Sequence, residues 1–69
     1  MYKIGNIVAN KKHLTIGIVR DIFDFGEVRT DADGVVSVLD LEIFEENKHL
    51  NFAIAPSTKK EIENTLILK

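Results

Sequence analysis

The chain of 69 residues contains no cysteine. A disulfide framework and a thiolate zinc site are therefore both excluded. It contains only two histidines, His13 and His49, and nothing in their spacing requires them to share a metal ion. We therefore expect no metal site and no cofactor.

Long hydrophobic runs are also missing. No apolar segment is long enough to span a bilayer, and the opening residues MYKIGN lack the apolar region and cleavage site of a secretory signal. We expect a cytoplasmic protein that does not associate with a membrane.

The chain is short enough that its stability becomes a question. It forms one domain, residues 1–69, and a chain of this length buries only about 60% of the surface that its unfolded form exposes. Small domains without disulfides or metals depend on efficient packing or on a partner chain. A protein partner or a second copy, forming a homo-oligomer, is therefore expected.

The sequence is rich in β-branched residues, most of them between Thr15 and Phe44. This stretch predicts two connected hairpins. The apolar residues of its first run do not alternate strictly, which predicts a strand that bends from one sheet into another. Gly17 indicates a bulge or a close backbone approach, and Asp33-Gly34 predicts a tight turn with a positive φ at Gly34.

The remaining segments are less regular. Residues 9–14 are predicted as an exposed basic loop, and residues 40–46 as an irregular connection with partial strand character. The alternating residues 48–55 predict a last strand that Pro56 ends. We place Phe52 in its centre, packed in the core against Ile18, Val38, Ile62 and Leu66. Thr58 and Glu61 have the spacing of a capping box for a C-terminal helix.

Together these patterns predict a mainly β fold. We expect a small antiparallel SH3-like barrel of about five strands with a short C-terminal helix. The predicted strands span about 2–8, 15–25, 27–31, 35–39 and 48–55, and the helix spans about 58–67.

The chain resembles KOW-type SH3-like barrels in three segments, 3–8 (KIGNIV), 16–22 (IGIVRDI) and 36–38 (VSV). The resemblance implies that Gly17 lies where a loop ends and a strand starts. It also implies that loops on one rim contact RNA or ribosomal and polymerase partners. The size and the stretch 28–36 (VRTDADGVV) further resemble short uncharacterised phage and prophage proteins of Gram-positive bacteria. The acidic middle of the chain and its few aromatics differ from nucleic-acid-binding KOW modules.

Charge is divided along the chain. The first twenty residues carry four basic side chains and no acid, whereas residues 21–46 carry nine acids and Arg29. The basic residues Lys3, Lys11, Lys12 and Arg20 are candidates for nucleic-acid contact. The candidate acidic interaction surface comprises Asp21, Asp24, Asp31, Asp33, Glu42, Glu45 and Glu46.

No motif predicts catalysis. If Gly34 took the glycine position of a calcium-binding loop, Arg29 would take the first ligand position, so residues 31–34 are interpreted as a turn. Paired carboxylates need a cleft, and the interior of a small barrel is filled by side chains. Ser37 and Ser57 have no neighbouring base. We expect no enzyme activity.

Three functions from different classes remain open. The first is a small protein-binding or self-associating module. The second is an RNA- or DNA-contacting barrel that uses the four basic residues. The third is a nucleic-acid mimic, which requires the acidic residues to share one face.

Overall fold

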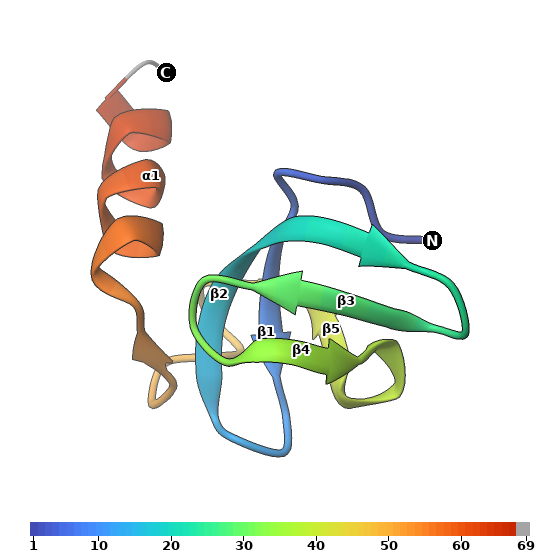
Figure 1. Ribbon diagram of the computed structural model, residues 1–69. Coiled ribbons are helices and arrows are strands. Elements are labelled where there is room, and N and C mark those ends of the chain that lie inside the picture. Colours follow the sequence, from blue (N-terminus) through green and yellow to red (C-terminus); the bar gives the residue numbers. More distant parts are fainter. Residues whose placement is uncertain (68–69) are drawn as a thin grey trace.

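The computed structural model describes the backbone of residues 1–67 and the side chains of residues 1–64. Five short strands and one long strand precede a terminal helix (Figure 1). The strands are β1 (Ile7–Asn10), β2 (Thr15–Phe23), β3 (Glu27–Thr30), β4 (Gly34–Ser37), β5 (Leu41–Ile43) and β6 (Ala53–Ile54). A 3₁₀-helix, η1 (Val38–Asp40), joins β4 to β5, and α1 spans Pro56–Ile67.

The sheet has the order β4-β3-β2-β1-β5, with all neighbours on this path antiparallel. The small β6 pairs in parallel with the start of β2. The predicted mainly β class, with five antiparallel strands and a short C-terminal helix, is confirmed. Within the described residues the path ends at β4 and at β5, so the sheet curves without closing into a barrel.

Strand β2 bends as its apolar pattern predicts. Its first half pairs with β1 (Val8↔Gly17) and its second half pairs with β3 (Ile22↔Val28), and the register shifts after Val19. The predicted close approach at Gly17 is also confirmed. A Cβ there would lie 2.9 Å from the Cβ of Ala32, so a larger residue would push the β3–β4 turn away.

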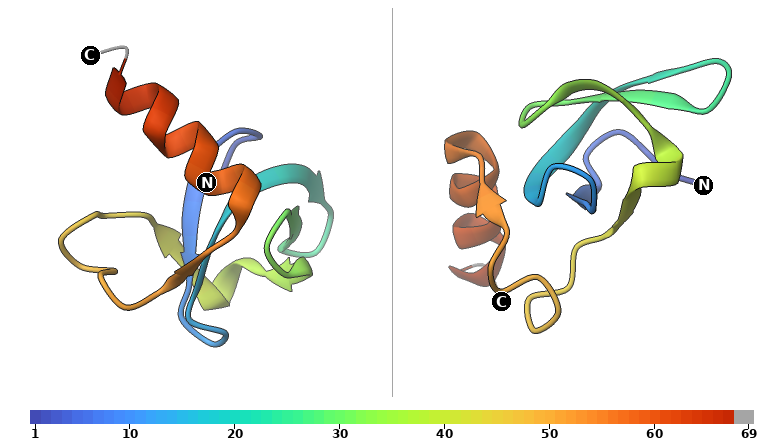
Figure 2. Two further views of the ribbon diagram at one scale, coloured as in Figure 1. Left: turned by 90° about the vertical axis from the view of Figure 1, so that its left-hand side faces the viewer. Right: turned by 90° about the horizontal axis from the view of Figure 1, so that it is seen from below.

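The core lies inside this bend. One cluster of buried side chains, against which Tyr2 and Val38 pack, comprises Val8, Val19, Val28, Val36 and Leu41. Ile16 and Ile18 of β2 are buried as well. Helix α1 stands beside the sheet, on the side opposite the N-terminus (Figures 1 and 2). No helix among residues 1–67 is long and apolar enough to cross a membrane.

The first strand was predicted too early in the chain. Residues 3–6 form a turn instead, because the N–H of Asn6 donates to the carbonyl of Lys3 at 3.1 Å and Gly5 has a φ of +96°. The strand then includes Ala9 and Asn10, which were expected in the loop. The Asn10 side chain ends it by accepting hydrogen bonds from the N–H groups of Lys12 and His13.

Two further strand boundaries differ from the prediction. Strand β2 ends at Phe23 because residues 24–26 form the turn to β3. Strand β4 ends at Ser37, whose Oγ accepts the N–H of Leu39 at 3.2 Å and starts the 3₁₀ turn. In the region 40–46, the partial strand character corresponds to β5, which pairs with β1.

The largest correction concerns residues 48–55. Only Ala53–Ile54 is extended, since the chain before it turns through hydrogen bonds from the His49 N–H to Glu45 and from the Phe52 N–H to His49. Phe52 is half-buried, so its predicted central core position is wrong, and His49 is the buried residue of this segment. Ile62 is half-buried, and the predicted contact with Leu66 lies outside the described side chains.

The helix begins two residues before the predicted position. Pro56 occupies its first position, where a backbone N–H would have no acceptor within the helix, so proline costs no hydrogen bond there. The N–H of Lys59 donates to the carbonyl of Ala55 at 2.8 Å. Thr58 therefore lies inside the helix and does not cap it. It is fully buried, and its hydroxyl donates to the carboxylate of Asp31.

Candidate binding pocket

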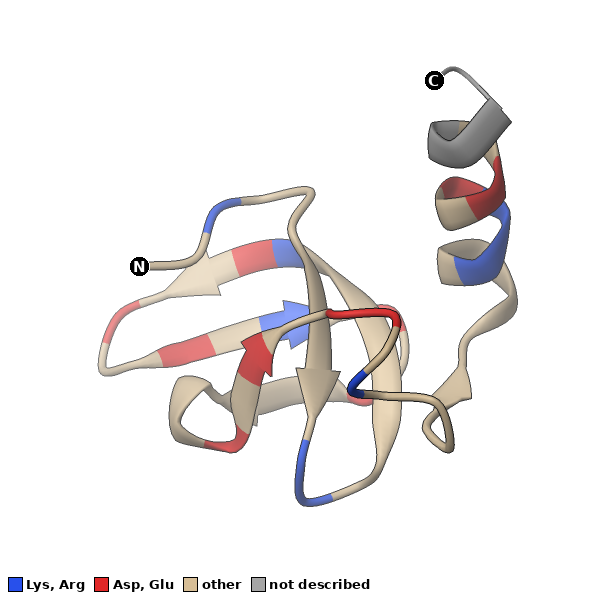
Figure 3. Ribbon diagram, turned by 180° about the vertical axis from the view of Figure 1, so that it is seen from behind, with Lys and Arg blue, Asp and Glu red and all other residues tan. Residues whose placement is uncertain are grey.

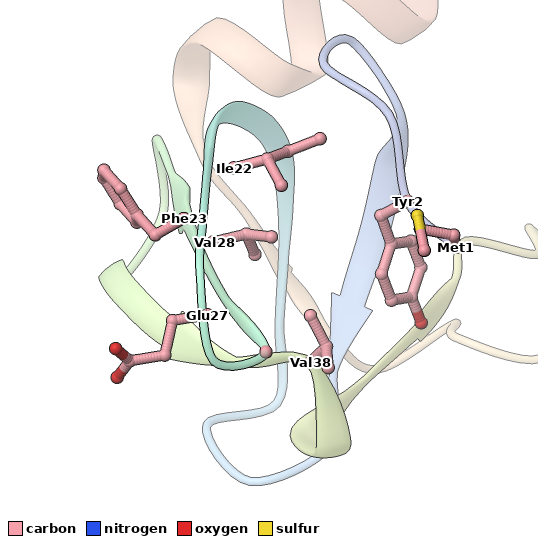
Figure 4. Close-up of a pocket in the computed structure, with 8 residues that line it drawn as sticks. Met1, Tyr2, Ile22, Phe23, Glu27, Val28 and Val38 are labelled. Carbon is pink, nitrogen blue, oxygen red and sulfur yellow. The ribbon is translucent and has the colours of Figure 1, made fainter.

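An apolar pocket of about 550 Å³ opens at the end of the molecule that carries the β2–β3 turn. It is lined by Met1, Tyr2, Ile22, Phe23, Gly26, Glu27, Val28 and Val38. In Figure 4, Ile22, Val28 and Val38 extend toward the opening that Tyr2 borders on the other side. The outer ends of Phe23 and Glu27 point away from this opening.

The pocket continues the core at the end of the β2–β3 hairpin, where no further segment of the described residues covers the apolar side chains. Ile22 and Val28 are directly opposite each other on neighbouring strands, so their side chains share the concave face of the sheet. Val28 is buried by the core cluster, whereas Ile22, farther toward the turn, is 47% exposed. The curved β2–β3 hairpin therefore extends beyond the core that fills its base.

Two hydrogen bonds hold the other walls in place. The N–H of Val38 donates to the carbonyl of Gly26 at 2.9 Å, which fixes η1 against the hairpin turn. The N–H of Gly5 donates to the carbonyl of Val19 at 2.8 Å and ties the N-terminal segment to β2. Because both walls are tied to the same hairpin, the pocket is formed before any ligand arrives.

Large apolar side chains are exposed around the opening. Phe25 lies at the hairpin turn next to the lining residue Gly26, and Leu39 follows Val38. The predicted strands 15–25 and 27–31 place Phe25 and Gly26 at a strand boundary and give them no functional role. The segment Phe23-Asp24-Phe25, with two aromatics beside a turn, was the available signal for an exposed apolar site.

The pocket offers burial with little polar chemistry. Its titratable side chains are Tyr2 and Glu27. Burial, and the nearby charge of Glu42, raise the pKa of Tyr2, so its hydroxyl stays protonated at neutral pH. Because the Glu27 carboxylate points away from the opening (Figure 4), the neutral phenol of Tyr2 is the polar side chain beside the apolar walls.

The predicted acidic residues do not form one surface. Asp24 lies in the turn at one end of β3, whereas Asp31 and Asp33 lie in the turn at its other end. Glu42 belongs to β5, and Glu45 and Glu46 follow that strand. Figure 3 shows the acidic segments spread over several elements.

Several of these acids also have partners inside the chain. Asp21 accepts a hydrogen bond from Nε of Arg29 at 2.6 Å, and Asp33 accepts one from the Thr15 hydroxyl. An internal ion pair or hydrogen bond makes a carboxylate less available to an external partner.

Asp31 joins three parts of the fold. Its carboxylate accepts the backbone N–H of Ile18 in β2 at 2.7 Å, and it accepts the hydroxyls of Ser57 and Thr58 in the first turn of α1. Burial opposes ionisation of Asp31, but these hydrogen bonds and the charge of Arg20, 3.9 Å away, outweigh it and lower the pKa. Asp31 therefore attaches the first turn of the helix to β2.

Glu42 and His49 form a second internal pair. Nδ1 of His49 lies 2.9 Å from the backbone N of Glu45 and 3.1 Å from its carbonyl oxygen, and Nε2 forms a 2.6 Å hydrogen bond with the carboxylate of Glu42. The hydrogen bond from His49, together with Lys48, lowers the pKa of Glu42. The imidazole is buried and packs against the rings of Phe44 and Phe52, so the pair holds the loop 44–52 to β5.

The predicted basic residues are separated by the length of β1. Lys11 and Lys12 lie in the turn that follows the strand, whereas Lys3 lies in the segment that precedes it. Arg20 is near the Lys3 end, since Ile7 at the start of β1 pairs with Ile18. Figure 3 shows basic segments at both ends of the sheet. The structure therefore does not bring the four residues into one patch.

Residues 31–33 form the predicted turn, and Gly34 has the expected positive φ of +76°. Within the described part of the chain, no three histidine, aspartate or glutamate residues are grouped so that they could hold a metal ion.

Comparison of the chain with protein-family models, with curated proteins and with solved structures gave no match. Its function must therefore be inferred from the pocket and the surfaces beside it.

Proposed function

We propose that this chain is a small, non-enzymatic, cytoplasmic binding module that receives an apolar side chain of a protein surface in the pocket beside the β2–β3 turn. The protein that supplies this side chain is a different chain or a second copy of the same one.

The observation that carries the proposal is the uncovered end of the core. A surface of this size seldom gathers several large exposed apolar side chains around a preformed opening unless it binds something. The volume of about 550 Å³ lies in the range of binding pockets. Burial of apolar area in such an opening provides about 25 cal/mol for each Å² removed from water.

The relation to KOW-type SH3-like barrels stays a proposal. The resemblance implies that Gly17 ends a loop and starts a strand, whereas β2 begins at Thr15 and Gly17 pairs with Val8 inside the strand. The sheet is also open between β4 and β5 in the described residues. We keep the relation as a proposal about fold and do not transfer the nucleic-acid contacts of that family.

Nucleic-acid contact and nucleic-acid mimicry are less well supported. Contact would need a continuous basic surface, and Lys3 and Lys11 lie beyond opposite ends of β1. Mimicry would need acids on one face, and Asp24 and Asp33 lie at opposite ends of β3.

A matched pair of variants tests the proposal. Ile22 in the pocket and Ile43 on β5 are both strand isoleucines, 47% and 53% exposed. The immobilised wild type, Ile22→Lys and Ile43→Lys are each incubated with extract of the source cells supplemented with tagged free chain, and retained proteins are quantified by mass spectrometry. We expect at least one protein, or the tagged chain itself, to be retained by the wild type and by Ile43→Lys but lost with Ile22→Lys. If nothing shows this dependence on Ile22, the proposal is wrong.

A further inference from the structure

Phe25 is the most unusual residue at this end of the molecule. Its side chain is 99% exposed, and its backbone has a φ of +67°. A left-handed conformation is unfavourable for a bulky L-residue and is ordinarily occupied by glycine or asparagine at a turn. The chain thus holds a large apolar ring in water on a strained backbone, and such a combination points to a function outside the folded monomer.

The pocket lies directly beside this ring. Gly26, the next residue, lines the pocket, and so do Phe23 and Glu27 on either side of the turn. Ile22, Val28 and Val38 provide apolar walls that a phenyl ring could contact. Phe25 does not line the pocket of its own chain, and its side chain is almost fully exposed.

A protruding ring next to a matching pocket is a self-complementary arrangement. In a dimer with twofold symmetry, a contact from one copy to the other is repeated in reverse. An axis beside the hairpin turn would therefore place both Phe25 rings in the two pockets. A second copy would use both features, because each chain carries the ring and the pocket.

The charges beside the pocket and the available surface area are both compatible with a dimer of this kind. The hairpin turn carries Asp24, and the exposed Lys3 follows the lining residue Tyr2 in the chain. A hairpin that docks at the opening of a second copy brings Asp24 toward the segment that carries Lys3. A standard interface covers about 800 Å² on each partner. This is roughly a sixth of the 4891 Å² surface of the chain, and exposed apolar residues on both sides of the opening are available to supply it.

We propose that two copies of this chain associate about a twofold axis beside the β2–β3 turn, with Phe25 of each copy inserted into the pocket of the other. This inference rests on the proposed function, because it assigns the occupant of the same pocket. The helix α1 stays outside this interface, since it lies on the other side of the sheet (Figure 2).

Sedimentation equilibrium from micromolar to millimolar protein tests the association. We expect the mass of the wild type to rise from 7.8 kDa toward twice that value. Phe25→Asn removes the ring and tolerates the positive φ, so the variant should fold and should dimerise at least about tenfold more weakly, as expected for the loss of an aromatic anchor. The control Leu50→Asn removes an exposed apolar side chain from the loop 44–52 and should dimerise like the wild type. Amide spectra that remain dispersed establish that each variant is folded.

Mixing two variants gives the sharper result. Phe25→Asn keeps the pocket without the ring, and Ile22→Lys keeps the ring with an altered pocket. Neither can form a ring-in-pocket contact with itself, but a mixed pair keeps one such contact. We expect the equimolar mixture to associate more tightly than either variant alone. If Ile22→Lys is not folded, the dimer dissociation constant of Phe25→Gly is compared with that of the wild type, and this comparison also measures the contribution of the ring.

Two outcomes would overturn this inference. One is a wild type that stays monomeric throughout the concentration series, and the other is a dimer that Phe25→Asn leaves unchanged. The proposed function fails separately. A monomeric wild type that still captures another protein in an Ile22-dependent manner would refute only the pairing of two copies, and would show a different occupant in the pocket.

Discussion

Glycines at two positions make the β3–β4 turn possible for different reasons. At Gly17 the constraint is space, since a Cβ would also lie 3.0 Å from Oδ1 of Asp31. At Gly34 the constraint is the backbone alone. Its φ is +76° and a Cβ at this position would meet nothing within 4 Å, so any loss of stability there measures the conformational cost of the turn.

We predict that Gly34→Val lowers the free energy of unfolding by about 1–2 kcal/mol, the cost of a left-handed conformation for an L-residue. Gly34→Asn should cost less, because asparagine tolerates this region. Urea denaturation of the three proteins measures the difference. Equal stabilities for the valine and asparagine variants would mean that Gly34 does not adopt the positive φ in solution.

At the scale of elements, polar side chains hold the two peripheral parts of the chain to the sheet. Asp31 attaches the first turn of α1 to β2, and the His49–Glu42 pair attaches the loop 44–52 to β5. Asp31 is 26 and 27 residues away from Ser57 and Thr58, whereas His49 is only seven residues away from Glu42. Both attachments depend on a carboxylate whose pKa is lowered in the folded state, so both weaken in acid.

The attachment of α1 should therefore depend on pH. Because the pKa of Asp31 is lowered, the folded protein binds that proton less readily than the unfolded chain, and the contribution of Asp31 is complete above the unfolded value of about 3.9. It is lost as the pH falls through the lowered pKa. Asp31→Asn should destabilise the protein by about 1.5–3 kcal/mol near neutral pH, the value for hydrogen bonds to a charged group.

Urea midpoints at about pH 5 and about pH 3 measure this contribution. The loss of stability between the two should be smaller for Asp31→Asn than for the wild type, since the remaining acid dependence includes that of Glu42. Asp24→Asn, at the hairpin turn, is the control and should keep the acid dependence of the wild type. An unchanged acid dependence in Asp31→Asn would contradict the assigned role.

At the scale of the whole molecule, the bent strand β2 contributes buried side chains from both of its faces. Val19 belongs to the valine cluster inside the bend, and Ile16 and Ile18 are buried as well. The radius of gyration of 11.3 Å is close to the value of about 11 Å expected for a compact chain of this length. The chain is thus compact although its sheet is open and its helix stands to one side.

This distribution of burial predicts which truncations unfold the protein. Ile18→Ala removes a fully buried side chain and should cost about 2–5 kcal/mol, a large part of the stability of so small a domain. Phe52→Ala should cost clearly less than the about 3–5 kcal/mol of a buried phenylalanine, since Phe52 is half-buried and contacts the ring of His49. Thermal denaturation of both variants compares them. If Phe52→Ala were the more damaging change, the loop 44–52 would have to pack into the core more deeply than the structure shows.

The sequence by itself determined those strands and turns whose pattern spans only a few neighbouring residues. The β-branched runs specified β2, β3 and β4, because alternation and turn residues act over a few positions, and Asp33-Gly34 specified the turn between the last two. Proline and the residues after it specified the helix, although Pro56 starts the helix and Thr58 does not cap it. The bend in β2 was predicted as well, since apolar residues without strict alternation must be covered on more than one side.

Tertiary structure decided what depends on distant partners. Residues 48–55 alternate like a strand, yet most of them form turns, and the buried His49 contacts Glu42, which lies outside the segment and is not encoded by its alternation. The pocket arises for the same reason. Ile22, Val38 and Tyr2 are each ordinary apolar positions in the sequence, and only the curvature of the hairpin and the open edge of the sheet place them around one opening. Phe25 next to it was visible in the sequence, but its exposure and its left-handed backbone were decided by the geometry of the turn.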